Sequence, residues 1–304
     1  LADLVSLLSG RDFETKEYRD DIVAESYQKL DAGIVQFINQ YNFTQFVMAI
    51  KGAGFVSSKQ LNSQMTLDFA YTLYLMLRSD PTIPNEQIKR HVQKWFVLST
   101  LTSRYIGSPE TQMDRDMRNI EEKGFLNFKT EVEASTLSET FWTVTLPQNL
   151  ETSSVNSPAF NTFLAAQINL NCNSLLMKGT KISDLITISG DVHHIFPRNY
   201  LKKNGIDNKT KYNQVANYIY LDTQVNKAIG DDPPFAYFSK VREQCRTKAI
   251  TLGNISDEET LYCNLEENSI PHHIISMDIT DYESFLQERR KLMAKLMQRY
   301  YLEL

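Results

Sequence analysis

Four of the five histidines in this 304-residue chain occur as two adjacent pairs, and one of these pairs has neighbours suited to chemistry. His193-His194 lies in the stretch DVHHIFP, and Asn217 and Asn226 follow as the first and last residues of NYIYLDTQVN. A histidine whose pKa lies near neutrality can take a proton from water. An imidazole and an amide oxygen can also bind a divalent cation. The histidine pair therefore predicts a metal-binding and proton-abstracting centre.

Hydrolysis of a phosphodiester needs this combination of groups. A base takes a proton from the attacking water, and a cation stabilises the charge that develops on the phosphate and on the leaving oxygen. Two strands and a helix can gather these groups compactly. The sequence predicts that order: a β-branched strand over 187–195 ends at the histidines, and a second, alternating strand covers 217–221. A helix capped by Asp222 then runs to Ile229 and carries Asn226.

The rest of the chain is predicted to be helical. The spacing of apolar residues, together with Ser-Pro starts and Gly or Pro breaks, predicts helices over 22–41, 43–51, 66–78, 86–105, 157–170, 180–186, 235–249 and 281–302, and one beginning near Ser108. A domain boundary is expected within 123–156. In the helix over 281–302, the inward residues should be Phe285, Leu292, Leu296 and Tyr300. Arg289 and Arg290 on the same helix are expected at the surface or in ion pairs.

The stretch DVHHIFP followed by VANYIYLDTQVNKAIGDDPP resembles the ββα-metal core of HNH (His-Me finger) endonucleases. More narrowly, it resembles the nuclease half of GmrSD-type modification-dependent restriction and phage-defence proteins. The resemblance is close over 185–240. It implies that His193 is a metal ligand and that His194 is the general base. Asn217 would tie the hairpin together and orient the base, as the second catalytic residue, and Asn226 would be the other metal ligand. Since asparagine offers an oxygen where histidine is common, the cofactor should be Mg²⁺ or Mn²⁺.

The resemblance also implies an architecture and an activity. The fold class is mainly α with a small β-hairpin: a helical linker or bundle domain over 1–125, then an HNH-type nuclease domain over 126–304. Helices would wrap the ββα core at 187–230. The first domain resembles the region that follows the nucleotide-hydrolysing domain of these proteins, which would be a missing N-terminal partner. The expected function is a metal-dependent DNA endonuclease, the effector of a restriction or phage-defence system. Two alternatives stay open: a non-catalytic DNA- or protein-binding module on a degenerate HNH core, and an RNase.

The charge of the chain requires that any binding of DNA be local. The net charge is -5 and the pI is near 5.6, so no overall field attracts nucleic acid. A basic cluster between the two halves of the motif could offset this charge, or could be a solvated face. The residues predicted to contact DNA are Arg198, Lys202, Lys203 and Lys227. The DNA could carry modified bases.

The remaining sequence features exclude some classes of protein. Three cysteines occur without any C-x-x-C pair, which argues against a zinc ribbon and against a secreted disulfide framework. No signal peptide and no apolar run of membrane-spanning length is found. These features predict a cytoplasmic protein with no membrane partner. The second histidine pair, His272-His273, has no matching partner motif and is expected to be structural.

Overall fold

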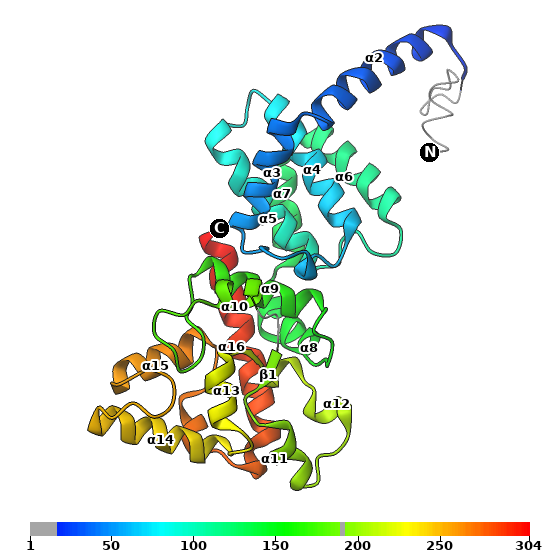
Figure 1. Cartoon of the computed structure of the whole chain (residues 1–304). Helices are drawn as coiled ribbons and strands as arrows, with labels where there is room; N and C mark the ends of the chain where they lie inside the picture. Colours follow the sequence, from blue (N-terminus) through cyan, green and yellow to red (C-terminus); the bar gives the residue numbers. More distant parts are fainter. Residues whose placement is uncertain (1–16, 189–191) are drawn as a thin grey trace.

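The first helices of the chain form one end of the molecule. The computed structural model describes residues 17–188 and 192–304, and in Figure 1 this end lies at the top. Its elements are α2 (Asp20–Phe37), α3 (Gln40–Gly52), η1 (Ser58–Gln60), α4 (Gln64–Ser79), α5 (Asn85–Leu101), α6 (Pro109–Lys123) and α7 (Phe125–Thr136). The break that was predicted after residue 41 falls at Ile38-Asn39, because the Asn39 side chain caps α3 by accepting from the Asn42 amide. Helix α5 ends before the predicted residue 105, and Ser103 follows in a left-handed conformation.

The segment that was predicted to hold a domain boundary is largely helical. After α7 come a π-helical turn, η2 (Phe141–Thr145), and α8 (Leu146–Asn149). Phe128, Trp142 and Leu150 of this segment are buried in the same apolar core as residues from both ends of the molecule. The division at residue 125 stays a prediction.

The other end of the molecule holds the hairpin. Its elements are α9 (Pro158–Asn169), α10 (Ile182–Ile188), β1 (Val192–His194), α11 (Arg198–Lys203), α12 (Lys209–Tyr212), η3 (Val215–Asn217), β2 (Tyr218–Tyr220), α13 (Thr223–Ile229), α14 (Pro234–Thr247), α15 (Glu258–Glu267), η4 (His272–Ser276), η5 (Ile279–Asp281) and α16 (Tyr282–Glu303). Within the described ranges, β1 and β2 form the only sheet, and they are antiparallel. The predicted fold class, mainly α with a small β-hairpin, is confirmed at that level. No helix in the described part of the chain is long and apolar enough to cross a bilayer.

Both predicted strands are shorter in the structure. Residues 187 and 188 end α10, so they were wrongly assigned to the first strand, and 189–191 lie outside the described residues. The β-branched run Ile186-Thr187-Ile188 favours a strand, but it continues the helix that Ile182 anchors in the core. The second strand begins at Tyr218, because Asn217 closes a 3-10 turn.

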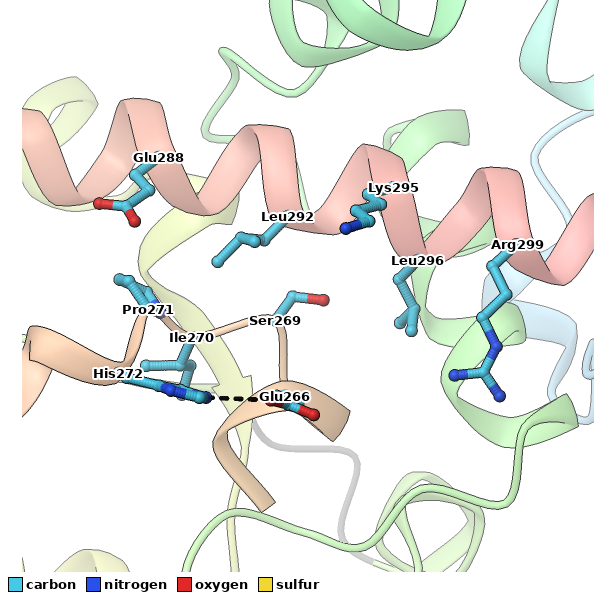
Figure 2. Close-up of a pocket in the computed structure, with 10 residues that line it drawn as sticks. All are labelled: Glu266, Ser269, Ile270, Pro271, His272, Glu288, Leu292, Lys295, Leu296 and Arg299. Atoms are coloured by element: carbon cyan, nitrogen blue, oxygen red, sulfur yellow. Dashed lines mark ion pairs between the residues drawn. The ribbon is translucent and has the colours of Figure 1, made fainter. Parts of the chain in front are cut away.

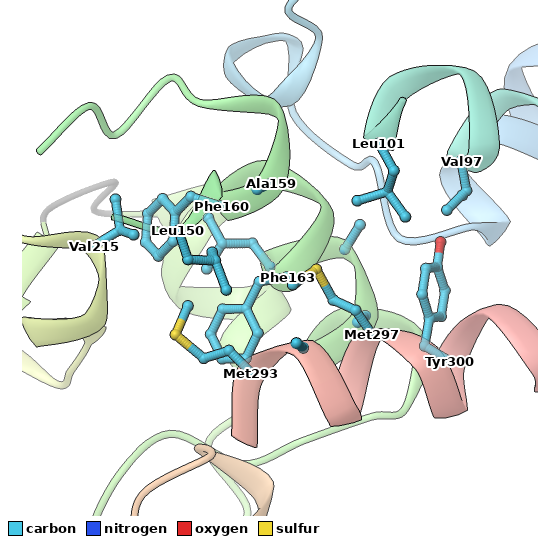
Figure 3. Packing of buried hydrophobic residues seen from close by; sticks show 14 of the residues in the cluster. Val97, Leu101, Leu150, Ala159, Phe160, Phe163, Val215, Met293, Met297 and Tyr300 are labelled. Atoms are coloured by element: carbon cyan, nitrogen blue, oxygen red, sulfur yellow. The ribbon is translucent and has the colours of Figure 1, made fainter. Parts of the chain in front are cut away.

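Helix α16 connects the two ends of the molecule. Figure 3 shows Met293 and Met297 of this helix packed beside Phe163 of α9, with Tyr300 next to Val97 of α5. The Tyr300 hydroxyl donates to the carbonyl of Ala53 at 2.5 Å. Phe285 and Tyr300 are buried as predicted, whereas Leu292 and Leu296 are only half-buried. In the middle of the helix the fully buried positions are Met293 and Met297, one residue after each predicted leucine, on the helix that packs against α9.

Candidate functional site

An open cavity of about 310 Å³ lies beside the hairpin and brings together the predicted base and both predicted metal ligands. His193 and His194 reach it from β1, and Asn226 reaches it from α13. Ladder pairing sets His193 opposite Ile219 and His194 opposite Tyr218. The chain therefore gathers at one place the imidazole and amide groups that the sequence predicts as a centre.

Helix α13 is fixed locally in the way that its sequence predicts. The Asp222 carboxylate accepts from the amides of Gln224 at 2.8 Å and Val225 at 3.2 Å, which caps the helix. Val225 and Ile229 are buried at i, i+4 spacing, so one face of the short helix is anchored in the core. Asn226 follows Val225 and is half-buried at the cavity.

The environment of His194 favours its neutral form. Burial lowers the pKa of His194 below its ordinary value of 6.5; a hydrogen bond to Asn213 opposes this, and the nearby Arg198 and His193 lower the pKa further. The Nε2 atom lies 3.0 Å from Asn213 Oδ1, and the ring meets the Tyr218 ring edge to face. A neutral imidazole at pH 7 is the form that can accept a proton.

The contact with Asn213 also selects a tautomer. An amide oxygen only accepts hydrogen bonds, so with Oδ1 facing the ring, Nε2 of His194 carries the proton. The lone pair then resides on Nδ1, which becomes the basic atom. Asn213 was not identified from the sequence, because no spacing rule singles out a residue in the connection between the strands.

Asn217 lies beneath the cavity and does not line it. Its side chain is fully buried; Oδ1 accepts from the Phe196 amide at 2.8 Å, and Nδ2 donates to the carbonyls of Phe196 at 3.1 Å and Tyr212 at 3.3 Å. The backbone adds a bond from the Ile195 amide to the Asn217 carbonyl at 2.9 Å. Asn217 therefore joins the exit of β1 to the start of β2. Its bonds are to Ile195, Phe196 and Tyr212, so it acts on the histidines through the backbone that follows β1, as a positioning residue.

Arg289 of α16 holds the same hairpin from behind. The prediction that it lies at the surface or in an ion pair is wrong: the side chain is 0% exposed. Nη1 donates to the carbonyls of Ala216 at 2.9 Å and Tyr218 at 2.7 Å, and Nη2 donates to Asn268 at 3.3 Å. Burial lowers the pKa of the guanidinium to about 9, so it stays charged at neutral pH. The i+4 spacing from Phe285 through Arg289 to Met293 is a sequence signal that could have revealed this burial.

Two tyrosines complete the support of the hairpin. The Tyr237 hydroxyl donates to the carbonyl of Ile195 at 3.0 Å, directly after β1. The Tyr282 hydroxyl donates to the carbonyl of Lys211 at 3.0 Å, in the connection to β2. Burial raises the pKa of both phenols well above the usual 10, so they act as neutral donors. Side chains from α14 and α16 therefore fix the backbone around the histidines.

The predicted DNA-contacting residues are spread around the site. Arg198 starts α11 and lines the cavity, and it is exposed. Lys203 pairs with Asp231 at the cavity rim at 3.1 Å, and the Lys202 ammonium lies 5.2 Å from the centre of the Tyr212 ring. Lys227 is exposed on α13 and is not among the residues that line the cavity. Only Arg198 shares the cavity with the histidines, and contact of all four with DNA stays a prediction.

The donor set at the cavity fits a hard divalent ion with few protein ligands. In the described ranges no three His, Cys, Asp or Glu side chains gather to hold a metal. His193 and Asn226 nevertheless line one cavity, and an imidazole with an amide oxygen leaves most coordination positions to water and phosphate. Asp191, the first residue of the motif, lies outside the described residues.

No family model, no curated protein and no solved structure matches this chain.

Proposed function

We propose that this chain is a metal-dependent DNA endonuclease, the effector part of a cytoplasmic restriction or phage-defence system. The observation that carries the proposal is the convergence of His193, His194 and Asn226 on one open cavity. The order of two antiparallel strands and a helix around that cavity supports assignment to the HNH class. On this assignment, the partners are DNA, including DNA with modified bases, and a nucleotide-hydrolysing domain of the same protein.

His194 takes the proton of the attacking water. Its lowered pKa leaves the ring neutral at pH 7, and Asn213 directs the basic lone pair to Nδ1. The proton that arrives makes an imidazolium, which the Oδ1 atom of Asn213 stabilises through the Nε2 proton. Positioned general bases contribute roughly 10²- to 10⁴-fold to a rate.

His193 and Asn226 would hold Mg²⁺ or Mn²⁺ beside that base. A divalent ion bound there supplies positive charge to the phosphate and to the leaving 3′ oxygen. Arg198 lies at the same cavity and can pair with a non-bridging phosphate oxygen. Asn217 and Arg289 act indirectly. Asn217 holds the backbone at Phe196, after β1, and Arg289 holds the backbone at Ala216, before β2.

The test is cleavage of supercoiled plasmid DNA in the presence of Mg²⁺ or Mn²⁺. We expect His194→Ala to lower the cleavage rate by roughly 10²-fold or more, with an unchanged circular dichroism spectrum. His273→Ala is the matched control, since it removes one histidine of the other adjacent pair, and it should keep the full rate. Chelation by EDTA should abolish cleavage by the unaltered protein. Full activity in a folded His194→Ala preparation would refute the proposal.

The same assay separates the alternatives. Cleavage of single-stranded RNA in preference to DNA would identify an RNase. Absence of both cleavage and Mn²⁺ binding in a calorimetric titration would identify a non-catalytic binding module. Because burial lowers the pKa of His194, the acid limb of the rate profile should have its midpoint below pH 6.5.

A further inference from the structure

A second cavity, of about 540 Å³, lies between α16 and the loop that joins α15 to η4. Figure 2 shows this loop running beneath the helix, with Leu292 and Leu296 pointing down toward it. Ile270 and Pro271 of the loop are buried, and the two leucines are half-buried. The cavity therefore has an apolar lining that the protein leaves partly uncovered.

Ser269 places an unsatisfied hydroxyl in this lining. The residue is 3% exposed, and its Oγ has no hydrogen-bond partner. Its backbone has φ of 53°, the left-handed conformation in which the chain leaves α15, and the next amide, of Ile270, donates to the Leu265 carbonyl at 2.9 Å. In Figure 2 the hydroxyl points away from the loop, toward the space between Leu292 and Leu296. A buried hydroxyl is costly without a partner, so this one indicates a ligand that would supply the partner.

The charges around the cavity are separated along α16. At one end, Glu288 lies 3.0 Å from His273. Below the helix, near Ser269 in Figure 2, Glu266 of α15 lies 3.2 Å from His272. At the other end is Lys295, for which no ion pair is found within residues 17–188 and 192–304. Figure 2 shows the Lys295 ammonium directed back over the cavity, toward Leu292 and Ser269.

A neighbouring cation is already engaged. Arg299 also lines the cavity, but its Nε donates to the Glu303 carboxylate at 2.8 Å. Of the charged side chains around the cavity in the described part of the chain, Lys295 is thus the cation left to meet an added anion.

We propose that this cavity is a binding site for a small amphiphilic anion, with an apolar chain and one carboxylate head group. The carboxylate would pair with the Lys295 ammonium and accept from the Ser269 hydroxyl. The apolar chain would cover Ile270, Leu292 and Leu296. Glu288, at the end of the cavity away from Lys295, disfavours a second anionic group on the same ligand. This inference does not depend on the proposed nuclease activity.

The test is calorimetric titration of the whole chain with octanoate. Octan-1-ol, which keeps the apolar chain without the charge, should bind about fivefold more weakly, because it cannot form an ion pair with Lys295. Octanedioate should also bind more weakly, because its second carboxylate would lie near Glu288. Shortening octanoate to hexanoate should weaken binding by about fourfold for each methylene removed, the value expected for apolar burial.

Two variants locate the site. Lys295→Met should weaken octanoate binding by about fivefold, the loss expected for one exposed ion pair. Lys291→Met is the matched control, because Lys291 is exposed on the same helix and does not line the cavity. Ser269→Ala should weaken binding while leaving the melting temperature unchanged or higher, since it removes a hydroxyl that has no partner.

Several results of these titrations would contradict the proposal. Equal binding of octanoate and octan-1-ol, or equal affinities of Lys295→Met and Lys291→Met, would overturn the proposal. A drop in melting temperature for Ser269→Ala with unchanged octanoate affinity would assign the serine to the fold alone and overturn its part in the site. Failure of octanoate to bind the unaltered chain at millimolar concentration would also refute the site.

Discussion

Replacing Asn217 with alanine removes the side chain that joins the two strands at the base of the hairpin. The change unpairs the Phe196 amide, which donates to Oδ1 at 2.8 Å, and the Phe196 carbonyl, which accepts from Nδ2 at 3.1 Å. The third partner, the Tyr212 carbonyl, keeps a bond from the Tyr282 hydroxyl at 3.4 Å. Two buried backbone groups are therefore left without partners.

The expected loss in the free energy of unfolding follows from these two unpaired groups. A buried polar group without its partner costs roughly 1 to 3 kcal/mol, so Asn217→Ala should lower the free energy of unfolding by about 3 kcal/mol. Because folded domains are stable by roughly 5 to 15 kcal/mol, the variant should stay folded at 25 °C. The displaced end of β1 should carry His194 with it, and an error of about 1 Å in such a group lowers a rate by about 10²-fold.

Urea unfolding followed by far-ultraviolet circular dichroism measures the loss of stability. Asn213→Ala is the control: its side chain pairs with His194 in a half-buried setting, so the loss there should stay under about 1 kcal/mol. Plasmid cleavage should fall in both variants. A free energy of unfolding for Asn217→Ala within about 0.5 kcal/mol of the unaltered chain would contradict this reasoning.

Two further predictions concern the core. His91 is buried with both ring nitrogens unpaired, and burial lowers its pKa below 6.5. The unfolded chain therefore binds the proton more readily than the folded chain, and the free energy of unfolding falls as the pH drops below 6.5. His91→Leu should therefore raise the free energy of unfolding by about 1 kcal/mol at pH 7 and by more at pH 5, and a loss in urea titrations at both pH values would contradict this. Gly54 has φ of 95°, and an added Cβ would lie 2.0 Å from the Ala165 carbonyl oxygen, so Gly54→Ala should cost about 3 kcal/mol or more. Gly33→Ala, with open space around it in α2, should be neutral or stabilising by up to about 1 kcal/mol, and equal melting temperatures for the two glycine variants would refute the contrast.

The parts of the fold that were predicted well are those with local signals. Helix α13 begins where Asp222 can cap it, and α9 begins where Ser157 caps it and Pro158 occupies the first turn. The beginning of β1 was misplaced because Ile186 to Ile188 have side chains that favour a strand but continue a helix, which only the packing of α10 decides.

The site residues also fall into those with a local sequence signal and those without one. His193, His194 and Asn226 were found because their types and order are visible in the sequence. Arg289 and Asn213 were not found. The i+4 spacing could have indicated that Arg289 is buried, but no local pattern reveals the contacts that give the two residues their roles. Arg289 bonds to a carbonyl 71 residues away, and Asn213 bonds to a ring 19 residues away. The apolar pattern of α16 predicted Leu292 inside and Arg289 outside, whereas Leu292 is half-buried and Arg289 is fully buried.

The bond between Arg289 and the hairpin has a consequence for biosynthesis. Arg289 lies 73 residues after Ala216, so the ribosome completes β1, β2 and α13 well before it makes the side chain that holds them. Until α16 emerges and docks, the carbonyls of Ala216 and Tyr218 lack their donor. In a nascent chain the hairpin that carries the histidines therefore lacks this support until α16 has left the ribosome and docked.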